Sequence, residues 1–419
     1  MKRPAELLAQ PGWWCYDPAL ITICAALVSL GLVMVYSASV AVAVDLHHNE
    51  TYFFIRQVIF FLIGVIALVG LSRVPYQRLL IIGKPLYGLS LLLLVAVLVL
   101  GRHAGGAKRW IHAGILGQLQ PSELMKVALV LLLSGIFARD VRRAREFKRG
   151  LVHCVLLIAL PVALIVAEPD LGTSIIVAAT GFALYFAAGA NLLLFPLLLG
   201  AGGGIVALLT KMSAYRFSRF TTFLNPWAIK GAQGVAYQVQ QALIALGSGG
   251  LFGLGLGASR QKFSYLPAPH TDSIFAIVGE ELGFAGCVAV ILLFVALAWR
   301  GLAIARDAPD QFGALVATGI TSSLVAQAFI NIAAVSSSIP FTGVPLPFIS
   351  YGGSSLVVCM AGVGILLNIG SQAVPNTVAA AERPVTRKLI HRPIVGPRGN
   401  RVGRARTAIG PVHSSRHRS

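Results

Sequence analysis

Long apolar segments alternate with short polar ones along most of this 419-residue chain. Ten of them approach or exceed the ~20 residues with which an α-helix spans a bilayer. They lie at residues 18–40, 53–71, 85–100, 121–137, 151–167, 173–188, 191–209, 273–299, 312–335 and 354–370. The pattern predicts an all-α integral membrane protein with about ten transmembrane helices in one membrane domain, residues 18–370.

Composition agrees with this pattern and excludes an ordinary soluble domain, because 56% of the residues are hydrophobic and only 12% are charged. The first apolar segment lacks a small-residue cleavage site, so it is predicted to be a retained span rather than a removed signal peptide. The five cysteines lie in or beside predicted spans and show no metal-ligand or disulfide spacing.

The positions of the cations predict the orientation. If the N-terminal segment 1–17 is cytoplasmic, most of the 34 Lys and Arg face the cytoplasm, including the cluster Arg139–Arg149. The segment 371–419 is then a basic cytoplasmic tail, and its composition predicts disorder. About half of the net charge of +19 comes from this tail. We therefore expect contact with anionic membrane lipids and no nucleic-acid partner.

Three regions on the opposite side are longer than simple turns: residues 101–121, 210–272 and Ser336–Gly353. The second is a large extracytoplasmic loop between helices 7 and 8. Its stretch Gln241–Gly257 combines apolar residues with glycines, which is typical of a re-entrant or interfacial segment. Gly253-Leu-Gly255-Leu-Gly257 lacks the strand–helix context and the Gly-Lys-Ser/Thr ending of a nucleotide-binding loop.

Asp272 begins the eighth apolar helix, at the end of this loop. Two interpretations stay open. The carboxylate caps the helix, since it can accept backbone N–H bonds and complements the helix dipole. Alternatively, partial burial raises its pKa, so that it acts as a base toward a substrate hydroxyl group. His270, two residues earlier, either hydrogen-bonds a substrate or orients the loop.

Cations on the same side offer an anion site. Arg216 and Arg219 are three residues apart, so they share a helix face, with aromatic residues between them. Guanidinium donors suit a pyrophosphate, whereas anchoring at lipid headgroups is the alternative. Arg109, beside Lys108, runs against the positive-inside rule, so it either binds an anion or touches phospholipid phosphates.

Acids occur at three further places. Glu123 and Lys126, just after a predicted Ser122 cap, form an intramembrane pair that is either functional or a buried structural ion pair. Glu280 or Glu281, two turns into the eighth helix, is expected to pair with Lys126 or Arg109.

The turn Glu168-Pro-Asp170 suits either a metal or helix capping. No complete ligand set stands out, and whether a divalent cation assists pyrophosphate binding stays open. The run Val344–Ser355 is interpreted as a helix cap with tight packing.

Together these motifs resemble the SEDS (shape, elongation, division, sporulation) family over residues 17–372. The matching motifs are His270-Thr-Asp272, Gly279-Glu-Glu-Leu-Gly283, Pro345–Ser355, Gln120-Pro-Ser-Glu-x-x-Lys126, Glu168-Pro-Asp-Leu-Gly172 and Phe223-Leu-Asn-Pro-Trp227. The resemblance implies a ten-helix fold and a peptidoglycan glycosyltransferase that polymerises lipid II.

The resemblance also implies roles for residues and partners. Asp272 is the family's catalytic position, and the expected substrate-binding residues are Arg109, Glu123, Lys126, Arg216, Arg219, Lys262 and His270. A class B penicillin-binding protein transpeptidase is the implied partner, with other division proteins. The direct connection from Ser259–Lys262 to His270 resembles the division branch rather than the elongation branch, which implies the division septum.

One departure from the family pattern concerns the residues before His270. The run Pro267-Ala268-Pro269 stands where the family usually has Pro-Glu. Any role of that glutamate is therefore dispensable or replaced here.

Two other functions remain as alternatives. A polar cavity containing Glu123 and Lys126 would also serve a flippase for lipid-linked precursors, although no internal repeat suggests an inverted-repeat transporter. A non-catalytic division scaffold is the second alternative.

Overall fold

The computed structural model describes residues 16–104, 107–112, 118–228, 234–263 and 265–372. Contacts divide the chain into two units, Met1–Asn376 and Thr377–Ser419, of which the second lies outside the described residues. The predicted cytoplasmic N-terminus and basic tail also fall almost entirely outside them, so both remain predictions.

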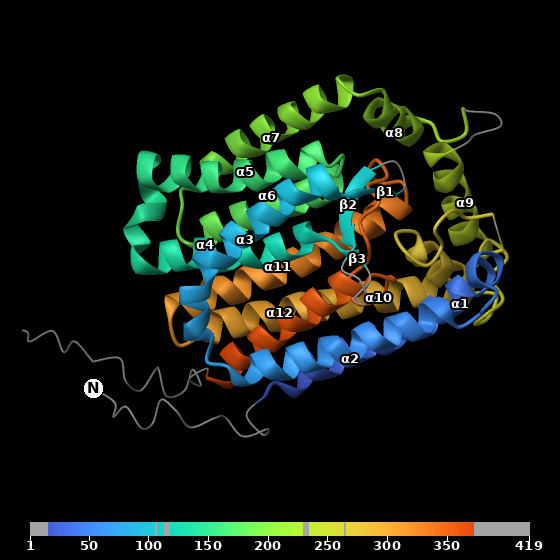
Figure 1. Ribbon diagram of the computed structural model, residues 1–419, viewed down its shortest axis with the longest axis horizontal. Helices are drawn as coiled ribbons and strands as arrows, with labels where there is room; N and C mark the ends of the chain where they lie inside the picture. The colour runs from blue at the N-terminus through green and yellow to red at the C-terminus, as the bar shows by residue number, and fades with distance from the viewer. Residues whose placement is uncertain (1–15, 105–106, 113–117, 229–233, 264, 373–419) are drawn as a thin grey trace, which may run out of the picture. The chain divides into compact units, whose positions relative to one another are not determined.

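Twelve α-helices form the described part of the chain (Figure 1). They are α1 (Pro18–His47), α2 (Tyr52–Arg73), α3 (Leu79–Leu100), α4 (Pro121–Arg139), α5 (His153–Ala167), α6 (Leu171–Ala187), α7 (Leu194–Lys211), α8 (Ala214–Leu224), α9 (Val235–Ser248), α10 (Ile274–Asp307), α11 (Gln311–Val335) and α12 (Gly353–Ser371). Nine helices of this part are long and apolar enough to cross a membrane, and α6 is a shorter apolar helix. These ten correspond to the ten predicted segments, which confirms a multi-pass helical membrane protein.

The long helices pack through small residues. In Figure 1, α1 and α2 lie alongside α10 and α12, and α2 packs along α12. A Cβ at Gly364 of α12 would lie 2.4 Å from the Leu68 carbonyl oxygen of α2, and one at Gly31 of α1 would lie 2.3 Å from the Phe348 carbonyl oxygen. Such close backbone approach is typical of helix packing in membranes, where van der Waals contact replaces hydrophobic burial.

A small antiparallel sheet between α3 and α4 was not expected from the sequence. It has the order β1 (Arg102–Ala104), β2 (Ala107–His112), β3 (Gln118–Leu119). Arg102 pairs with Trp110, and Ile111 with Leu119. These strands are too short for a period-two pattern to stand out in the sequence. The sheet matters because β2 carries Arg109.

The large loop contains α8 and α9, followed by a segment that we call the glycine loop, Gly249–Gly257. The predicted re-entrant stretch therefore divides into the end of α9 and this irregular loop. The loop lies against α10, which is interrupted at Gly283 (φ 71°, ψ −167°). Leu254 N and Gly255 N donate to the carbonyl oxygens of Glu280 and Glu281, at 3.0 and 3.1 Å.

Candidate active site

Asp272 lies just before α10 and does not cap it. The N-cap residue is Ser273, and this helix start has no side-chain cap hydrogen bond. The partly buried Asp272 carboxylate accepts instead from the Thr271 hydroxyl, at 2.9 Å from Oδ1. The capping interpretation is therefore wrong, because Asp272 precedes the N-cap by one residue and does not bond the first-turn amides.

Two neighbouring elements fix the position of Asp272. Asn331 of α11 donates from Nδ2 to the backbone oxygen of Asp272 at 2.8 Å and to that of Val344 at 2.7 Å. The second element is the segment between α11 and α12. A Cβ added at Gly343 would lie 3.3 Å from Asp272 Oδ2. The carboxylate therefore lies against the Gly343 backbone.

The surroundings of Asp272 favour a proton acceptor. Burial raises the pKa of its carboxyl above the ordinary value, opposed by the Thr271 hydrogen bond and then by the charges of Arg219 and Arg109. A carboxylate with a raised pKa holds a proton better, so it is a stronger base toward a hydroxyl group. The two arginines also place positive charge near this carboxylate.

Arg216 and Arg219 direct their guanidinium groups toward the helical bundle. Arg219 Nη1 donates to the carbonyl oxygens of Phe341 and Thr342, at 3.0 and 3.2 Å. Arg216 Nη2 donates to the carbonyl oxygen of Val166 at 2.9 Å, at the end of α5. These contacts favour a role at the site over anchoring to lipid headgroups.

Arg109 is buried beside the turn between α5 and α6. Its Nη2 donates to the Pro169 carbonyl oxygen, and its Nε lies 3.8 Å from Asp170 Oδ2. Asp170 caps α6 by accepting from Thr173 N at 3.1 Å. Of the two interpretations of this acidic turn, capping therefore applies to Asp170.

Glu168, in the same turn, is only 1% exposed. Burial and the Asp170 charge raise its pKa to about 8, against the opposing charge of Arg109. Its two carboxyl oxygens make no hydrogen bond within the described part of the chain. In that part, no group of three or more His, Cys, Asp or Glu could hold a metal ion.

His270 is buried between two aromatic rings. Its ring centroid lies 4.5 Å from that of Phe53 and 5.5 Å from that of Tyr351. Its backbone oxygen accepts from Tyr351 N at 2.8 Å. Burial lowers its pKa to about 4, so the imidazole is neutral at physiological pH. These contacts orient the loop that ends at Asp272.

Glu123 and Lys126 form a buried ion pair of 2.9 Å within the bundle. Helix α4 begins at Pro121, and its N-cap residue is Gln120 rather than the predicted Ser122. Lys126 also donates to Gln327 of α11, whose Nε2 donates to the Pro345 carbonyl oxygen at 2.9 Å. The pair is thus connected to the segment beside Asp272, and no described hydrogen bond or ion pair joins it to Asp272 itself.

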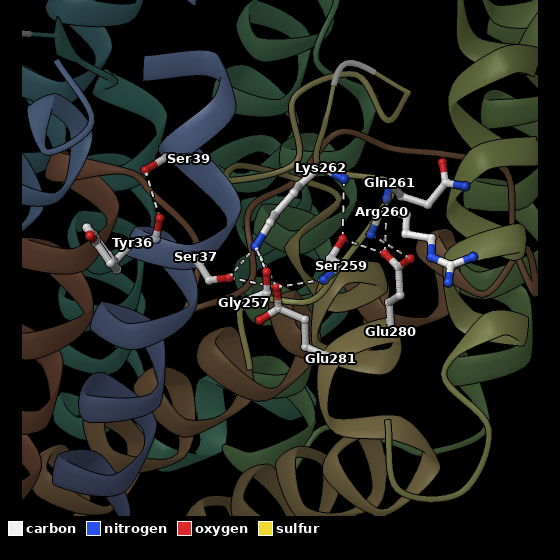
Figure 2. Close-up of polar contacts among 10 residues, drawn as sticks. All are labelled: Tyr36, Ser37, Ser39, Gly257, Ser259, Arg260, Gln261, Lys262, Glu280 and Glu281. Atoms are coloured by element: carbon white, nitrogen blue, oxygen red, sulfur yellow. Dashed lines mark hydrogen bonds and ion pairs between the residues drawn. The ribbon is translucent and has the colours of Figure 1, made fainter. Parts of the chain in front are cut away.

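Lys262 is held inside the protein, as Figure 2 shows. Its ammonium lies 3.1 Å from Glu281 Oε1, 3.1 Å from the Ser37 hydroxyl of α1 and 2.7 Å from the Gly257 carbonyl oxygen. The expected pairing of Glu280 or Glu281 with Lys126 or Arg109 is therefore wrong, because this face of α10 lies against α1 and the large loop. Three oxygens occupy the three donors of the ammonium.

Glu280 fixes the residues next to Lys262 (Figure 2). Its carboxylate accepts from the Ser259 hydroxyl, from Arg260 N at 3.0 Å and from Gln261 N at 3.4 Å. Buried carboxylates need such donors to offset desolvation. Both acids of α10 therefore attach residues 259–262 to the helix that begins beside Asp272.

We expect Gly343→Ala to lower activity and stability. Gly343 has φ +71°, where a Cβ costs about 1–2 kcal/mol, and the new methyl group would press on Asp272 Oδ2. Gly352→Ala is the matched control in the same segment, since its Cβ would meet only Ser355 Cβ, at 3.6 Å. Turnover and thermal midpoint are measured for both. Equal turnover in the two variants would contradict the contact with Asp272.

The structure thus brings Arg109 and Arg219 into electrostatic range of Asp272, with His270 and Arg216 on adjoining elements. It places Lys262, Glu123 and Lys126 in other contacts. Sequence reasoning missed two contributors. Asn331 is an amide within an apolar helix, a signal that could have identified it. Gly343 gave no comparable signal, because its contact with Asp272 depends on the fold.

A family model described as "Cell cycle protein", for FtsW, RodA and SpoVE, matches residues 18–374. The chain belongs to this family. The SEDS resemblance is thereby confirmed. Stage V sporulation protein E of Bacillus subtilis is 42% identical over 358 residues, covering 84% of this chain and 96% of the relative. A probable peptidoglycan glycosyltransferase FtsW of Trichlorobacter lovleyi is 39% identical over 363 residues, covering 85% and 93%.

Solved structures of the FtsW/RodA/SpoVE family share the fold. RodA of Thermus thermophilus, a rod shape determining protein, is 31% identical with a TM-score of 0.65, over 87% of this chain and 100% of that one. A chain from a peptidoglycan synthase complex, described as coordinating polymerization and crosslinking, is 30% identical. Its TM-score is 0.71, and the match covers 86% of this chain and 99% of that one.

Proposed function

We propose that this chain is a peptidoglycan glycosyltransferase that polymerises lipid II, with Asp272 as its catalytic base. One observation carries the proposal: the Asp272 carboxylate is partly buried, is not used as a helix cap, and has arginines nearby. The names of relatives, such as probable peptidoglycan glycosyltransferase, support the same reaction class.

In the proposed reaction, Asp272 removes the proton from the 4-hydroxyl of an acceptor GlcNAc. That oxygen forms a bond to C1 of the donor MurNAc, while the bond from C1 to the pyrophosphate oxygen breaks with inversion. Undecaprenyl pyrophosphate leaves with the electron pair, and the proton stays on Asp272 until it is lost to solvent. The raised pKa of Asp272 favours the proton transfer.

The developing charge on the pyrophosphate needs fixed cations. We assign this role to Arg109, Arg216 and Arg219, because their backbone contacts orient guanidinium groups at this end of the bundle. His270, neutral at physiological pH, is proposed to hydrogen-bond a sugar. We leave Lys262, Glu123 and Lys126 out of the binding set, since their charged groups are already engaged within the protein.

The finer assignments rest on the family resemblance. We propose a class B penicillin-binding protein transpeptidase as partner, supported by the similarity to a chain of a peptidoglycan synthase complex. We further propose a role in division at the septum of the inner membrane, with both termini cytoplasmic. Midcell rings of a tagged copy would support division, and dispersed wall patches would support elongation.

The direct test uses fluorescent lipid II in vesicles that contain the purified protein with its transpeptidase partner. Glycan length is followed on gels, and the leaflet position of the label is followed by quenching. We expect polymer from the wild type and none from Asp272→Asn. Transport of the label without lengthening would indicate a flippase. An Asp272→Asn strain that divides normally would indicate a scaffold.

A further inference from the structure

The glycine loop exposes large apolar side chains. Leu251, Phe252 and Leu256 are 67%, 84% and 62% exposed. The chain carries no charged residue from Val235 to Ser259. Large exposed apolar side chains so close together in the chain are typical of an interaction site.

The backbone of this loop is satisfied by the break in α10. Leu254 N and Gly255 N donate to the carbonyl oxygens of Glu280 and Glu281, before the break at Gly283. After the break, Phe284 N donates to the Gly250 carbonyl oxygen at 2.9 Å, and Ala285 N donates to that of Leu251 at 3.0 Å. Irregular backbone is tolerated at hydrocarbon depth only when its polar groups are paired within protein. The glycine loop and the interrupted part of α10 therefore pair each other's backbone polar groups.

Glycines allow the backbones of the glycine loop and α10 to approach closely enough for these hydrogen bonds. A Cβ at Gly253 would lie 2.1 Å from the Glu281 carbonyl oxygen, and one at Gly283 would lie 2.3 Å from Gly253 N. Both residues also have φ values, +81° and +71°, that favour glycine. The loop is therefore a fixed part of the α10 surface.

The depth of the glycine loop in the membrane can be inferred from the length of the uncharged part of α10. Arg300, near the other end of this helix, donates to Asp17 at the start of α1. The 18 residues between Glu281 and Arg300 are uncharged and span about 27 Å at 1.5 Å per residue. A hydrocarbon core is about 30 Å thick. Bonded to Glu280–Ala285, the loop lies at the edge of that core on the Asp272 side.

The loop continues an exposed apolar surface of α10. On α10, Phe284, Leu292 and Trp299 are 65%, 59% and 75% exposed, at spacings that place them on one helix face. The loop backbone joins α10 at Phe284, where this face begins.

We propose that the glycine loop is a membrane anchor, whose side chains Leu251, Phe252 and Leu256 contact the acyl chains of the leaflet on the Asp272 side. The loop runs directly into residues 259–262, which Glu280 and Glu281 attach to α10. Its insertion therefore fixes the height of the segment that leads to Asp272. This inference is independent of the proposed catalytic activity.

Collision-based spin-label measurements test the anchor. A nitroxide is attached to Phe252→Cys, in a chain whose native cysteines are replaced by alanine, in phosphatidylethanolamine–phosphatidylglycerol vesicles. Leu292→Cys provides the lipid-facing control, and Glu50→Cys, exposed between α1 and α2, provides the aqueous control. If Phe252→Cys does not fold, Leu256→Cys replaces it.

We expect the label at position 252 to collide with oxygen as at position 292 and to be several-fold less accessible to a water-soluble nickel complex than at position 50. Accessibility to nickel equal to that at position 50 would overturn the proposal. Low accessibility to both reagents would also overturn it, because it would show that a polyprenyl chain, a second copy or another protein covers the loop.

Discussion

Asp272→Asn is expected to reduce lipid II polymerisation by about 10²–10⁴-fold, the usual cost of removing a general base. The amide keeps the shape of the side chain but cannot accept the proton of the acceptor hydroxyl. Because Asp272 does not cap α10, the substitution removes no helix-stabilising contact. The thermal midpoint should therefore stay close to that of the wild type.

Asp307→Asn, at the opposite end of α10, is the matched control. It removes an acid that pairs with Arg306, so we expect nearly full activity. Initial polymerisation rates at saturating lipid II are compared for the three proteins. A rate for Asp272→Asn within a few-fold of the wild type would show that another group accepts the proton.

Lys262→Met should destabilise the protein by about 3–5 kcal/mol, because it leaves a buried carboxylate without its charge partner. Lys262 and Glu281 have side chains only 4% and 0% exposed. Ser37 still donates to Glu281, at 2.6 Å, but a hydroxyl does not neutralise the charge. The thermal midpoint in detergent should fall accordingly, whereas Lys211→Met, at an exposed position, should leave it unchanged.

The double variant Lys262→Met with Glu281→Gln distinguishes a structural role of Lys262 from a role in substrate binding. The neutral amide can accept from Ser37 and Ser259 N without a buried charge. We therefore expect most of the lost stability to return, together with any turnover lost in Lys262→Met. Recovery of the thermal midpoint without recovery of turnover would instead mean that the Lys262 ammonium meets the pyrophosphate.

The ten membrane helices could be predicted because each span needs a long apolar segment, and that signal is local. Their ends were less certain. The predicted segment 273–299 stops eight residues before the end of α10 (Ile274–Asp307), and α1 extends to His47. The sheet that carries Arg109 left no signal, since its strands have six residues or fewer.

Long-range partners could not be predicted. Ser37 and Glu281 are 244 residues apart, and Lys262 has several acids that could serve as its partner. The packing of α1 against α10 determines which acid pairs with Lys262. Likewise, the glycines of the glycine loop gave no sign that they complete the hydrogen bonds of a broken helix.

Asp272 was identifiable as a candidate base, but its local structural role was not. Thr271-Asp272-Ser273 has the composition of a helix start, and only the backbone shows that the helix begins after Ser273. Asn331 and Gly343, which contact Asp272, come from segments more than 50 residues away. Three-dimensional proximity, rather than sequence spacing, brings them together.

The acid limb of the pH profile tests the base role of Asp272 most directly. Catalysis needs the ionised carboxylate, so kcat/KM falls as the pH drops through its pKa. Burial raises that pKa above the ordinary 3.8. We expect a single-proton limb above pH 3.8 that moves to higher pH in Arg219→Gln, since the arginine charge lowers the pKa. The base role of Asp272 would be contradicted if the acid limb did not move in Arg219→Gln and was still present in the residual activity of Asp272→Asn.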